Sequence, residues 1–476
     1  MLLLKRMDEY GSLNTASLGT EYLMTNATTH SFIFGAMAEL VDNARDAGSK
    51  TLEIYTEESE DRSGGPMLCF KDDGCGMSKE EAESVIVFGS SRKTDQEEPI
   101  GMYGNGLKSG SMRLGKDMIL FTKKDGVLTC LMISRTFYEA ESVTQIKVPV
   151  PSFHASTKTM VGSDRKKHSV EVSLITKYSP FKTELSLLSQ FNSLKGDSGT
   201  LVIIYNLSTT PNGELELDFS SDPVDIKASV QLDHENSEDD DVIERRSFRA
   251  YASILYKSPR MKIILQKKRV RTRLLAYSLY LPKRILVNYK SFKNQNERQI
   301  NEAKKQIEVT RRKLTEIQSQ ISTVTKNSSN VANRNVMMQV RRLQNVEAEH
   351  QQQLAERQGI MELRKKQAKK SEQLEFHFGL NANERYHDGI FFYNSDRLIK
   401  MYVKEGTLQS KEEITYRGII AVVSVPKSSL LPTHNKQDFN DHAEYKKLKK
   451  CVDQAMQQTG GVPLVRRRST RLGGRG

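Results

Sequence analysis

The sequence predicts a mixed α/β (α+β) fold with more than one domain. Stretches of helical and strand periodicity alternate over residues 20–210, with glycine clusters between them, as is typical of an α/β domain. A basic stretch of purely helical character then occupies residues 290–371, and strand-like, aromatic sequence returns after it. With 476 residues, of which 37% are hydrophobic and 28% charged, the chain is long enough for two or three globular domains.

The charge and the cysteines narrow the class of protein. A net charge of +13 favours a polyanionic partner, either nucleic acid or an anionic membrane surface. The four cysteines show no CxxC pair and no zinc-ligand spacing, so we expect reduced thiols in an intracellular protein. The apolar start MLLL is too short for a signal peptide, and no stretch reaches the roughly 18 apolar residues of a membrane span. We therefore expect a soluble protein that does not enter a membrane.

The first domain is predicted to begin with a helix from about Thr29 to Ala47, because apolar residues recur there at helical spacing. The acidic stretch Asp233–Glu244 is expected to be an exposed loop or linker. Strands are predicted, from β-branched and aromatic content, at Thr51–Tyr55, Met67–Phe70, Met118–Thr122, Leu128–Ile133, Thr200–Tyr205, Phe248–Tyr256 and Met261–Leu265.

The stretch 290–371 contains 18 basic and 8 acidic residues, a net charge of +10. Apolar or small residues recur three and four apart, in a heptad seam with one lapse at Thr310. The polar stretch Lys326–Asn330 interrupts this seam, and a looser one follows. We expect two helices of about 30 residues that fold back as an antiparallel coiled-coil hairpin roughly 45 Å long. The members of the first seam are Ile300, Ala303, Ile307, Leu314, Ile317, Ile321 and Val324.

The strand-like sequence that returns after the hairpin places it inside a second domain. These strands are predicted at Phe376–Phe378, Gly389–Asn394 and Ile419–Val425. The basic, glycine-rich end of the chain, within 456–476, is expected to be a flexible tail.

Two motifs carry carboxylates. Within Glu39–Asp46 (ELVDNARD), Glu39, Asp42, Asn43 and Asp46 cluster opposite the apolar side of the predicted helix. Taken alone, this pattern also fits a solvated acidic helix face. The second motif, Asp72–Met77 (DDGCGM), follows a predicted strand directly. A carboxylate beside two glycines lets the backbone approach a flat ligand while the side chain accepts its N–H groups, although a tight turn has the same sequence.

The third motif is glycine-rich, Gly101–Met112 (GMYGNGLKSGSM). Glycines at this spacing free backbone N–H groups to converge on phosphate oxygens. The motif is not a P-loop, which needs GxxxxGK[ST], and it does not open the βαβ unit of a dinucleotide-binding fold. The preceding stretch Val87–Pro99 is polar and turn-rich, as suits a lid over a nucleotide.

The order and spacing of the three motifs resemble the GHKL (Bergerat) ATP-binding fold of gyrase, mismatch-repair ATPases, heat-shock chaperones and histidine kinases. The resemblance implies that ATP and Mg²⁺ are the ligands, with Glu39 as the general base. Asn43 would bind Mg²⁺ through its amide oxygen, and Asp72 would accept from the adenine amino group. The other nucleotide contacts implied by the resemblance are Gly76, Met77, Ser91, Gly101, Gly104, Asn105, Gly106, Leu107 and Lys108.

Further segments resemble the MORC (microrchidia) family, in the branch with a coiled-coil arm inserted in a transducer-like domain. These segments are Thr25–His30, Phe88–Ser91, Gly106–Arg113, Leu120–Lys124, Gly196–Thr200, Arg246–Tyr251 and Pro432–Phe439. The resemblance implies that Lys436 reaches the γ-phosphate as part of the catalytic site. Full members also carry a zinc-binding CW module with paired tryptophans, whereas this sequence has no Trp, so we expect a shortened or divergent member, or a sequence that stops early.

The resemblance also implies a domain organisation. The ATPase domain would cover residues 8–240. The transducer-like domain would comprise 241–289 and 372–455. The coiled-coil insertion would occupy 290–371, and the basic tail 456–476.

The same resemblance implies a nuclear protein that forms an ATP-gated homodimer, in which Tyr10–Tyr22 would cross to the partner. It would act on double-stranded DNA or chromatin in gene silencing or compaction, with silencing-complex proteins as possible partners. The basic hairpin is predicted to contact DNA phosphates without sequence preference, although its charge also fits a merely soluble coiled coil. The predicted DNA-binding residues are Arg311, Arg312, Lys313, Arg341, Arg342, Lys365 and Lys366.

Other classes remain open at this stage. Chaperones and mismatch-repair ATPases share the ATP motifs but lack a basic hairpin in the second domain, and a histidine kinase would need a phosphoacceptor helix before them. A non-catalytic scaffold could bind nucleotide through Asp72 and Asn43 and DNA through its arm. Only the retention of Glu39 speaks against it, because hydrolysis requires a base and binding does not.

Overall fold

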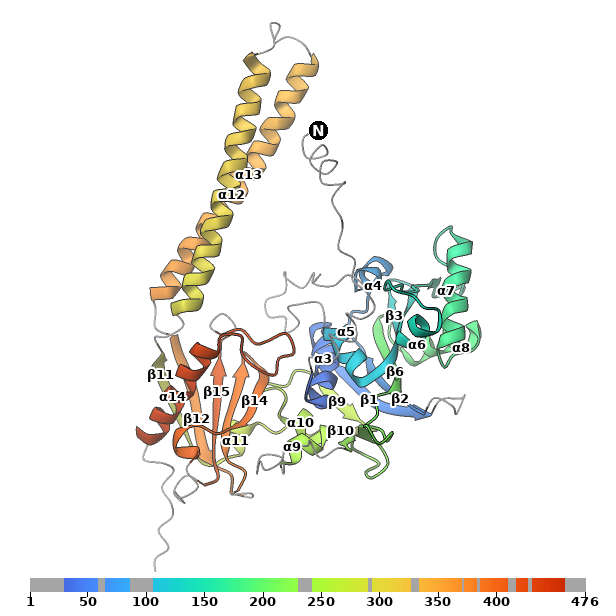
Figure 1. Cartoon of the computed structure of the whole chain (residues 1–476), viewed down its shortest axis with the longest axis vertical. Coiled ribbons are helices and arrows are strands. Elements are labelled where there is room, and N and C mark those ends of the chain that lie inside the picture. Colours follow the sequence, from blue (N-terminus) through green and yellow to red (C-terminus); the bar gives the residue numbers. More distant parts are fainter. Residues whose placement is uncertain are drawn as a thin grey trace, which may run out of the picture. The chain divides into compact units, whose positions relative to one another are not determined.

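The computed structural model describes residues 30–58, 65–85, 106–229, 242–289, 293–326, 334–369, 372–382, 386–409, 417–426 and 430–458. They form a mixed α/β structure, as predicted, in two compact units (Figure 1). The first unit runs to Ser278 and also contains the short segments Asp396–Lys400 and Pro432–Asp438. The second unit comprises the remainder of the chain after Ser278.

The first unit is built on an eight-stranded sheet with the order β10-β9-β1-β2-β6-β3-β4-β5. Neighbouring strands are antiparallel except β1 and β9, which are parallel. The strands are β1 (Thr51–Glu58), β2 (Pro66–Asp72), β3 (Gly115–Lys124), β4 (Val127–Ser134), β5 (Ser152–His154), β6 (Gly199–Leu207), β9 (Lys262–Leu265) and β10 (Lys268–Arg269). Each strand predicted before residue 210 lies within one of these, because runs of alternating apolar residues identify buried strands well.

Helices cover both faces of this sheet (Figure 1). On one face, α7 (Arg165–Tyr178) and α8 (Glu184–Ser189) bury a core that includes Phe121, Cys130 and Ile203. On the other face lie α3 (Ile33–Asp46) and α5 (Gly106–Leu114), which pack against each other. Because both faces are covered, strands such as β6 are buried along nearly their whole length.

The predicted strand Phe248–Tyr256 is wrong, because the segment forms the helix α10 (Phe248–Ile254), preceded by α9 (Ile243–Arg246). Ser247 caps α10 by accepting a hydrogen bond from the backbone N–H of Ala250. The buried side chains recur at helical spacing, and the rings of Phe248 and Tyr251 both pack against Phe34 of α3. Aromatic content suggested a strand, whereas the spacing of the buried residues fits a helix.

The predicted domain boundary at 240/241 differs from the observed one, since the first unit continues to Ser278. Two contacts explain the difference. Strand β9 pairs with β1, so that Ile263 lies opposite Leu52, and α10 packs on α3. Glu244, at the end of the predicted acidic loop, is buried in α9 and pairs with Arg273, while residues 233–241 of that loop lie outside the described part.

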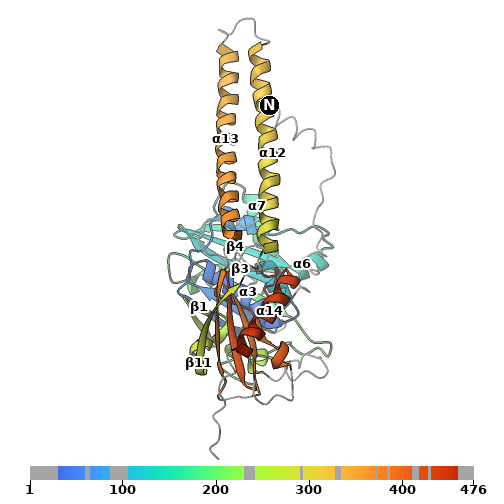
Figure 2. The same cartoon turned by 90° about the vertical axis from the view of Figure 1, so that its left-hand side faces the viewer.

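The second unit contains a five-stranded sheet with the order β11-β12-β15-β13-β14. Helix α14 (His442–Gln458) packs on it (Figure 2). The Tyr445 ring of this helix lies 5.2 Å from the Phe392 ring of the sheet. The predicted tail at 456–476 therefore begins too early, because Met456 is a buried residue of this helix. The strands are β11 (Tyr280–Tyr289), β12 (Glu372–Leu380), β13 (Gly389–Asn394), β14 (Arg397–Val403) and β15 (Ile419–Val425).

Two long helices, α12 (Lys293–Lys326) and α13 (Arg334–Lys369), are inserted between the paired strands β11 and β12. This helix pair is antiparallel, because Gln318 contacts Glu347 while Thr310, earlier in α12, contacts Arg357, later in α13. Thr310, the lapse in the predicted seam, is buried like its seam neighbours. Its hydroxyl oxygen accepts a hydrogen bond from the Arg357 guanidinium at 2.6 Å, so a polar contact replaces the apolar one.

The remaining short elements are α4 (Lys79–Val85), α6 (Arg135–Ala140), η3 (Gln190–Ser193), β7 (Leu217–Asp218), β8 (Lys227–Ala228), α11 (Leu275–Ser278) and η5 (Gly406–Leu408). No helix in the described part of the chain is long and apolar enough to cross a membrane. All four cysteines are unpaired, as expected. The predicted lid at 87–99 and the predicted strap at 10–22 lie outside the described residues.

Candidate functional site

Helix α3 carries two carboxylates into the interior of the first unit. Glu39 and Asp42 lie three residues apart, on one side of the helix, and are 3% and 0% exposed. A solvated acidic face, which the sequence also allowed, is therefore excluded. Buried carboxylates require compensating partners, because desolvating an unpaired charge costs several kcal/mol.

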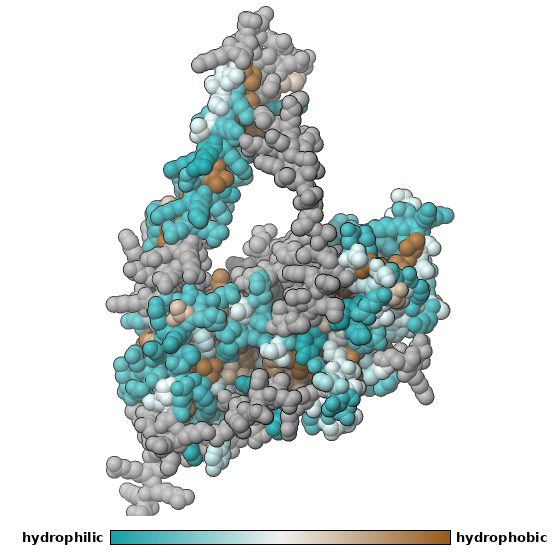
Figure 3. Space-filling model, in the orientation of Figure 1, coloured by the Kyte–Doolittle hydropathy of each residue, from teal (hydrophilic) through white to brown (hydrophobic). Residues whose placement is uncertain are grey.

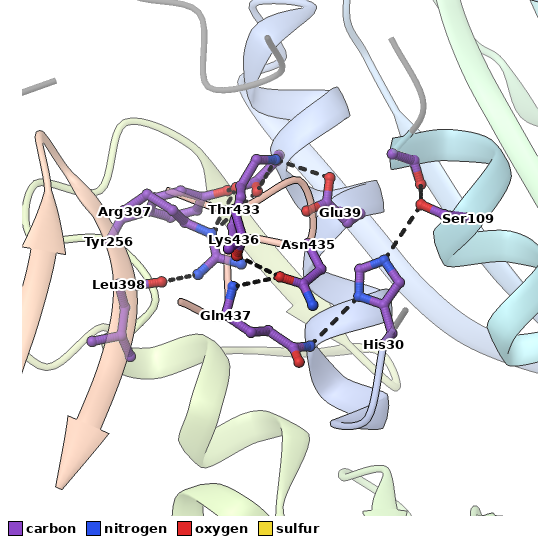
Figure 4. A network of polar contacts seen from close by, with 12 residues as sticks. His30, Glu39, Ser109, Tyr256, Arg397, Leu398, Thr433, Asn435, Lys436 and Gln437 are labelled. Carbon is purple, nitrogen blue, oxygen red and sulfur yellow. Dashed lines mark hydrogen bonds and ion pairs between the residues drawn. The ribbon is translucent and has the colours of Figure 1, made fainter. Parts of the chain in front are cut away.

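Lys436 supplies this compensation to both carboxylates. Figure 4 shows its contact with Glu39. Its ammonium group lies 2.9 Å from Glu39 Oε2 and 2.8 Å from Asp42 Oδ2, and the residue is 5% exposed. Lys436 has a φ of +51°, which is unfavourable for a residue other than glycine. The tight loop 432–438 holds it there, because the backbone N–H of Lys436 donates to the Thr433 carbonyl and that of Thr433 to the Asp438 carbonyl.

Asp42 has two further partners. Arg397, at the start of β14, donates from Nε to both carboxylate oxygens, at 3.0 and 3.1 Å. The Tyr256 hydroxyl donates to Oδ1 at 2.6 Å. Arg397 is itself 2% exposed, so the whole contact is closed to solvent.

These contacts act on the pKa values in opposite directions. Burial raises the pKa of Glu39 above its ordinary value, and Lys436 opposes that rise. Burial would also raise the pKa of Asp42, but Arg397 and Lys436 together hold it below its ordinary value. Asp42 is therefore the fixed anion of the pair, and Glu39 is the more basic carboxylate.

Two buried polar atoms on this side of α3 have no hydrogen-bond partner among the described residues, Glu39 Oε1 and Asn43 Nδ2. Such atoms are uncommon and point to a ligand or to water. A half-turn of the Asn43 amide would present its oxygen at the same position, and an amide oxygen is a suitable ligand for Mg²⁺. The residues therefore fit the predicted metal and nucleotide.

The glycine-rich segment reaches this site through α5. A Cβ atom at Gly106 would lie 2.3 Å from Glu39 Oε2, and one at Gly110 would lie 2.8 Å from the Ala36 carbonyl oxygen. Both glycines thus let α5 approach α3 closely. Lys108 is 1% exposed, with its ammonium donating to the Val85 carbonyl at 2.7 Å, and burial lowers its pKa to about 8.

Several predicted nucleotide contacts remain predictions. Leu107, beside Lys108, is half-buried. Ser91, Gly101, Gly104 and Asn105 lie outside the described residues.

The Asp72 motif lies just beyond the C-terminal end of α3. Asp72 Oδ1 accepts hydrogen bonds from the Ser49 hydroxyl at 2.9 Å and from the Gly74 backbone N–H at 2.8 Å. Within the described part of the chain, Asp72 Oδ2 accepts none, so it can receive an exocyclic amino group. Gly76 has a φ of +64°, and a Cβ atom there would lie 2.2 Å from the Lys123 carbonyl oxygen. The Met77 backbone N–H donates to Thr122 Oγ1 at 2.8 Å.

A weaker polar chain joins the Lys436 loop to α5 (Figure 4). Gln437 Nε2 lies 3.5 Å from His30 Nδ1, and His30 Nε2 lies 3.4 Å from Ser109 Oγ. Burial, followed by the nearby charges of Lys436, Arg113 and Arg397, lowers the pKa of His30 to about 4. The neutral imidazole can accept at Nδ1 and donate at Nε2, which matches both contacts.

The structure thus brings Glu39 and Asn43 of α3 together with Lys436. Asp72, the last residue of β2, lies near the C-terminal end of α3. The sequence interpretation did not assign roles to Tyr256 or Arg397, and it recorded Asp42 only as part of the acidic cluster. Helical spacing could have identified Asp42 as a site residue, since it places Asp42 on the same side of the helix as Glu39 and Asn43. No local sequence pattern identifies Tyr256 or Arg397 as site residues.

The predicted DNA-binding residues lie on the helix pair of the second unit. Arg311, Arg312, Lys313, Arg341 and Arg342 are exposed, and Lys365 is half-buried and paired with Glu362. The Lys366 side chain lies outside the described ones. Figure 3 shows that the visible surface of the helix pair is mainly hydrophilic.

Comparison with known families agrees with this architecture. A profile described as Histidine kinase-, DNA gyrase B-, and HSP90-like ATPase matches residues 30–167, which include Glu39, Asn43 and Asp72. A second profile, described as Morc6 ribosomal protein S5 domain 2-like, matches residues 328–459. The fold and the site therefore define an ATPase domain of the GHKL class.

Comparisons with individual proteins, which cover nearly all of this chain, identify the family within this class. The chain is 44% identical over 450 residues to ATPase MORC2 of Homo sapiens, covering 94% of this chain and 43% of that protein. It is 42% identical over 456 residues to MORC family CW-type zinc finger protein 1 of Mus musculus, covering 95% and 46%. ATPase morc-1 of Caenorhabditis elegans is 31% identical over 451 residues, covering 94% and 51%. The chain spans about half the length of these relatives, and it belongs to the MORC family of GHKL ATPases.

Proposed function

We propose that this chain hydrolyses ATP, with Glu39 as the general base and Lys436 as the cation that meets the γ-phosphate. The contact between Glu39 and Lys436 carries this proposal. These residues are 397 positions apart in the sequence, yet they lie within 2.9 Å in a buried site beside Asn43. A base and a phosphate-binding cation side by side are the two protein groups that phosphoryl transfer to water requires.

In the proposed reaction, Glu39 accepts a proton from water while the water oxygen attacks the γ-phosphorus. The bond from the γ-phosphorus to the leaving ADP oxygen breaks as the new bond forms. Lys436 stabilises the charge on the phosphate oxygens, and Asp72 Oδ2 accepts from the adenine amino group. Mg²⁺, when bound through Asn43, would neutralise phosphate charge.

The test of this function is Glu39→Gln, which keeps the shape of the side chain but removes the basic carboxylate. We expect kcat to fall by about 100-fold or more, with ATP affinity retained, because general-base catalysis contributes roughly that much. Steady-state ATPase assays and titration with a fluorescent ATP analogue measure the two quantities.

Glu53→Gln is the matched control. Glu53 pairs with Lys71 on the surface of β1, so its loss should leave turnover unchanged. Parental turnover in Glu39→Gln would contradict the base assignment and favour a non-catalytic nucleotide-binding scaffold.

We further propose that the helix pair binds the backbone of double-stranded DNA with little sequence preference. Its net charge of +10 over 290–371 supports this. Six of its exposed cations form no ion pair within the described part of the chain, so their charge is not neutralised locally. These are Lys304, Lys305, Arg311, Lys313, Arg341 and Arg342.

Family membership supports the wider role. We propose that ATP binding drives homodimerisation, with residues 10–22 crossing to the partner, and that hydrolysis reopens the dimer. Such a switch would act on chromatin in the nucleus, in gene silencing or compaction with silencing-complex proteins. Light scattering with and without a non-hydrolysable ATP analogue tests dimerisation directly, because a nucleotide-independent mass would contradict the switch.

A further inference from the structure

We propose that Asp42 is a positioning residue, itself held by Arg397 and Tyr256. Asp42 keeps Lys436 anchored while the Lys436 ammonium group exchanges its contact with Glu39 for a contact with the γ-phosphate. Asp42 is then neither a second base nor a metal ligand. The proposal rests on the roles proposed above for Glu39 and Lys436. It assigns functions to Asp42 and to two residues outside the ATP-binding motifs, Tyr256 and Arg397. Its support comes from the unequal contacts of the two carboxylates.

Asp42 has no remaining capacity for a ligand. Oδ1 accepts from Tyr256 at 2.6 Å and from Arg397 at 3.0 Å, while Oδ2 accepts from Arg397 at 3.1 Å and from Lys436 at 2.8 Å. The side chain is fully buried. A carboxylate with four short contacts and no exposure cannot exchange protons with substrate water without breaking one of them. It is suited to holding a cation in place.

Glu39 has the opposite arrangement. Among the described residues, Lys436 is its one hydrogen-bond partner, through Oε2, and Oε1 has none. Gly106 packs against the same carboxylate, because a Cβ atom there would lie 2.3 Å from Oε2. Glu39 therefore faces the segment that is predicted to bind phosphate. Of the two contacts of Lys436, the one to Glu39 is the contact that an arriving phosphate can replace.

Arg397 makes this exchange possible through charge balance. Two carboxylates share one ammonium group, and Arg397 adds a second positive charge on the Asp42 side. Because Arg397 already compensates Asp42, Lys436 does not have to neutralise two anions. Without Arg397, both carboxylates would compete for the single ammonium group and hold it back from the phosphate. Tyr256 contributes a neutral hydrogen bond, so its loss should matter less.

The first test is Arg397→Gln in the full chain. We expect kcat to fall by about tenfold or more while KM and the affinity for a fluorescent ATP analogue change by less than about threefold. Arg397→Lys restores the charge but not the guanidinium geometry, so its kcat should lie between those of Arg397→Gln and the parent. Tyr256→Phe should lower kcat by about threefold, since it removes one hydrogen bond and no charge.

The matched control is Lys400→Gln. Lys400 lies three residues after Arg397 and pairs at 3.0 Å with Asp438, two residues after Lys436, so it joins the same two segments away from both carboxylates. It should keep parental kcat. An equal loss in Lys400→Gln would mean that any loosening of these segments slows turnover, and it would overturn the positioning role.

Parental kcat in folded Arg397→Gln would also overturn the proposal, as would failure of Arg397→Lys to exceed Arg397→Gln. If Arg397→Gln does not fold, Tyr256→Phe decides: a loss of about threefold in kcat with unchanged KM supports positioning, and no loss overturns it. Glu39→Gln is measured in parallel. Parental turnover there refutes the base assignment itself, whatever the Arg397 and Tyr256 variants show.

Discussion

The buried site of the first unit and the helix pair of the second unit use the same charged residue types in opposite ways. In the site, the side chains of Glu39, Asp42, Arg397 and Lys436 are at most 4% exposed, and every charge meets an opposite charge. In the helix pair, the ion pair between Arg312 and Glu308 is 79% and 64% exposed, and most of the cations around it have no ion-pair partner among the described residues.

This difference shows that the buried charges hold side chains in a fixed geometry, whereas the exposed charges are available to bind a ligand. A buried ion pair is costly to break, because removing one partner leaves the other desolvated and uncompensated. An exposed pair contributes little to stability, since water screens it and the long side chains lose entropy when they meet. Substitutions in the buried site should therefore change stability and turnover, whereas substitutions in the helix pair should change ligand binding alone.

The largest effect on stability is expected from Lys436→Met. This variant removes the partner of Glu39 and leaves a buried carboxylate uncompensated, so the free energy of unfolding should fall by about 3 kcal/mol. Urea denaturation at pH 7.5 measures the change. Lys400→Met, which breaks a partly exposed pair with Asp438, should cost less than about 1 kcal/mol. Similar losses in both variants would remove the distinction between the buried and the exposed pairs.

A pH effect of intermediate size is expected from His30, which is 2% exposed. Burial and nearby positive charges together lower its pKa from 6.5 to about 4. Because the unfolded chain binds the proton more readily than the folded one, stability is complete above pH 6.5 and falls as the pH decreases towards 4. Between pH 7.5 and pH 5 the loss should be about 2 kcal/mol. Lys436, Arg113 and Arg397 are the charges that face the ring.

The measurement for His30 compares the parent with His30→Gln, in which the ring is absent. Unfolding free energies of the two proteins at pH 7.5 and pH 5 give the difference that belongs to this residue, because all other titrating groups are shared. If both proteins lose the same stability between these pH values, burial of a neutral His30 makes no contribution.

The smallest effect on stability is expected from neutralising Arg311, Arg312 and Lys313 with glutamine. Stability should change by less than about 1 kcal/mol, since all three are exposed. DNA binding should weaken, and the slope of log affinity against log salt should decrease by about one to three. The control replaces Arg165, Lys166 and Lys167, an equally exposed basic triplet on α7, with glutamine. An unchanged slope in the first variant, or the same decrease in both, would place DNA contact elsewhere.

Local patterns predicted much of the fold. The strands predicted at Gly389–Asn394 and Ile419–Val425 match β13 and β15 in their bounds, because short buried strands are continuous in apolar residues. The strand predicted at Phe248–Tyr256 was wrong, since β-branched and aromatic residues also suit a buried helix that is capped by a serine. Thr310 looked like a lapse because its partner, Arg357, lies 47 residues later.

The site divides in the same way. Glu39, Asn43 and Asp72 lie within local motifs of fixed spacing, and the structure places them on or beside one helix. Lys436 was assigned by family resemblance, and composition alone would have made it a surface lysine. Tyr256 and Arg397 meet Asp42 across 214 and 355 residues, and neither lies in a motif with a chemical signature. Contacts of that separation are set by the tertiary fold, which sequence periodicity does not encode.

The point at which the helix pair is inserted between β11 and β12 determines how freely the length of the insertion can vary. Tyr289 at the end of β11 and Glu372 at the start of β12 are direct partners in the antiparallel ladder. The two ends of the insertion are thus as close as the ends of an ordinary hairpin loop, which a turn of about two to five residues can close. The length of this appendage can therefore grow, shrink or disappear between related chains without altering the register of the strands that bear it.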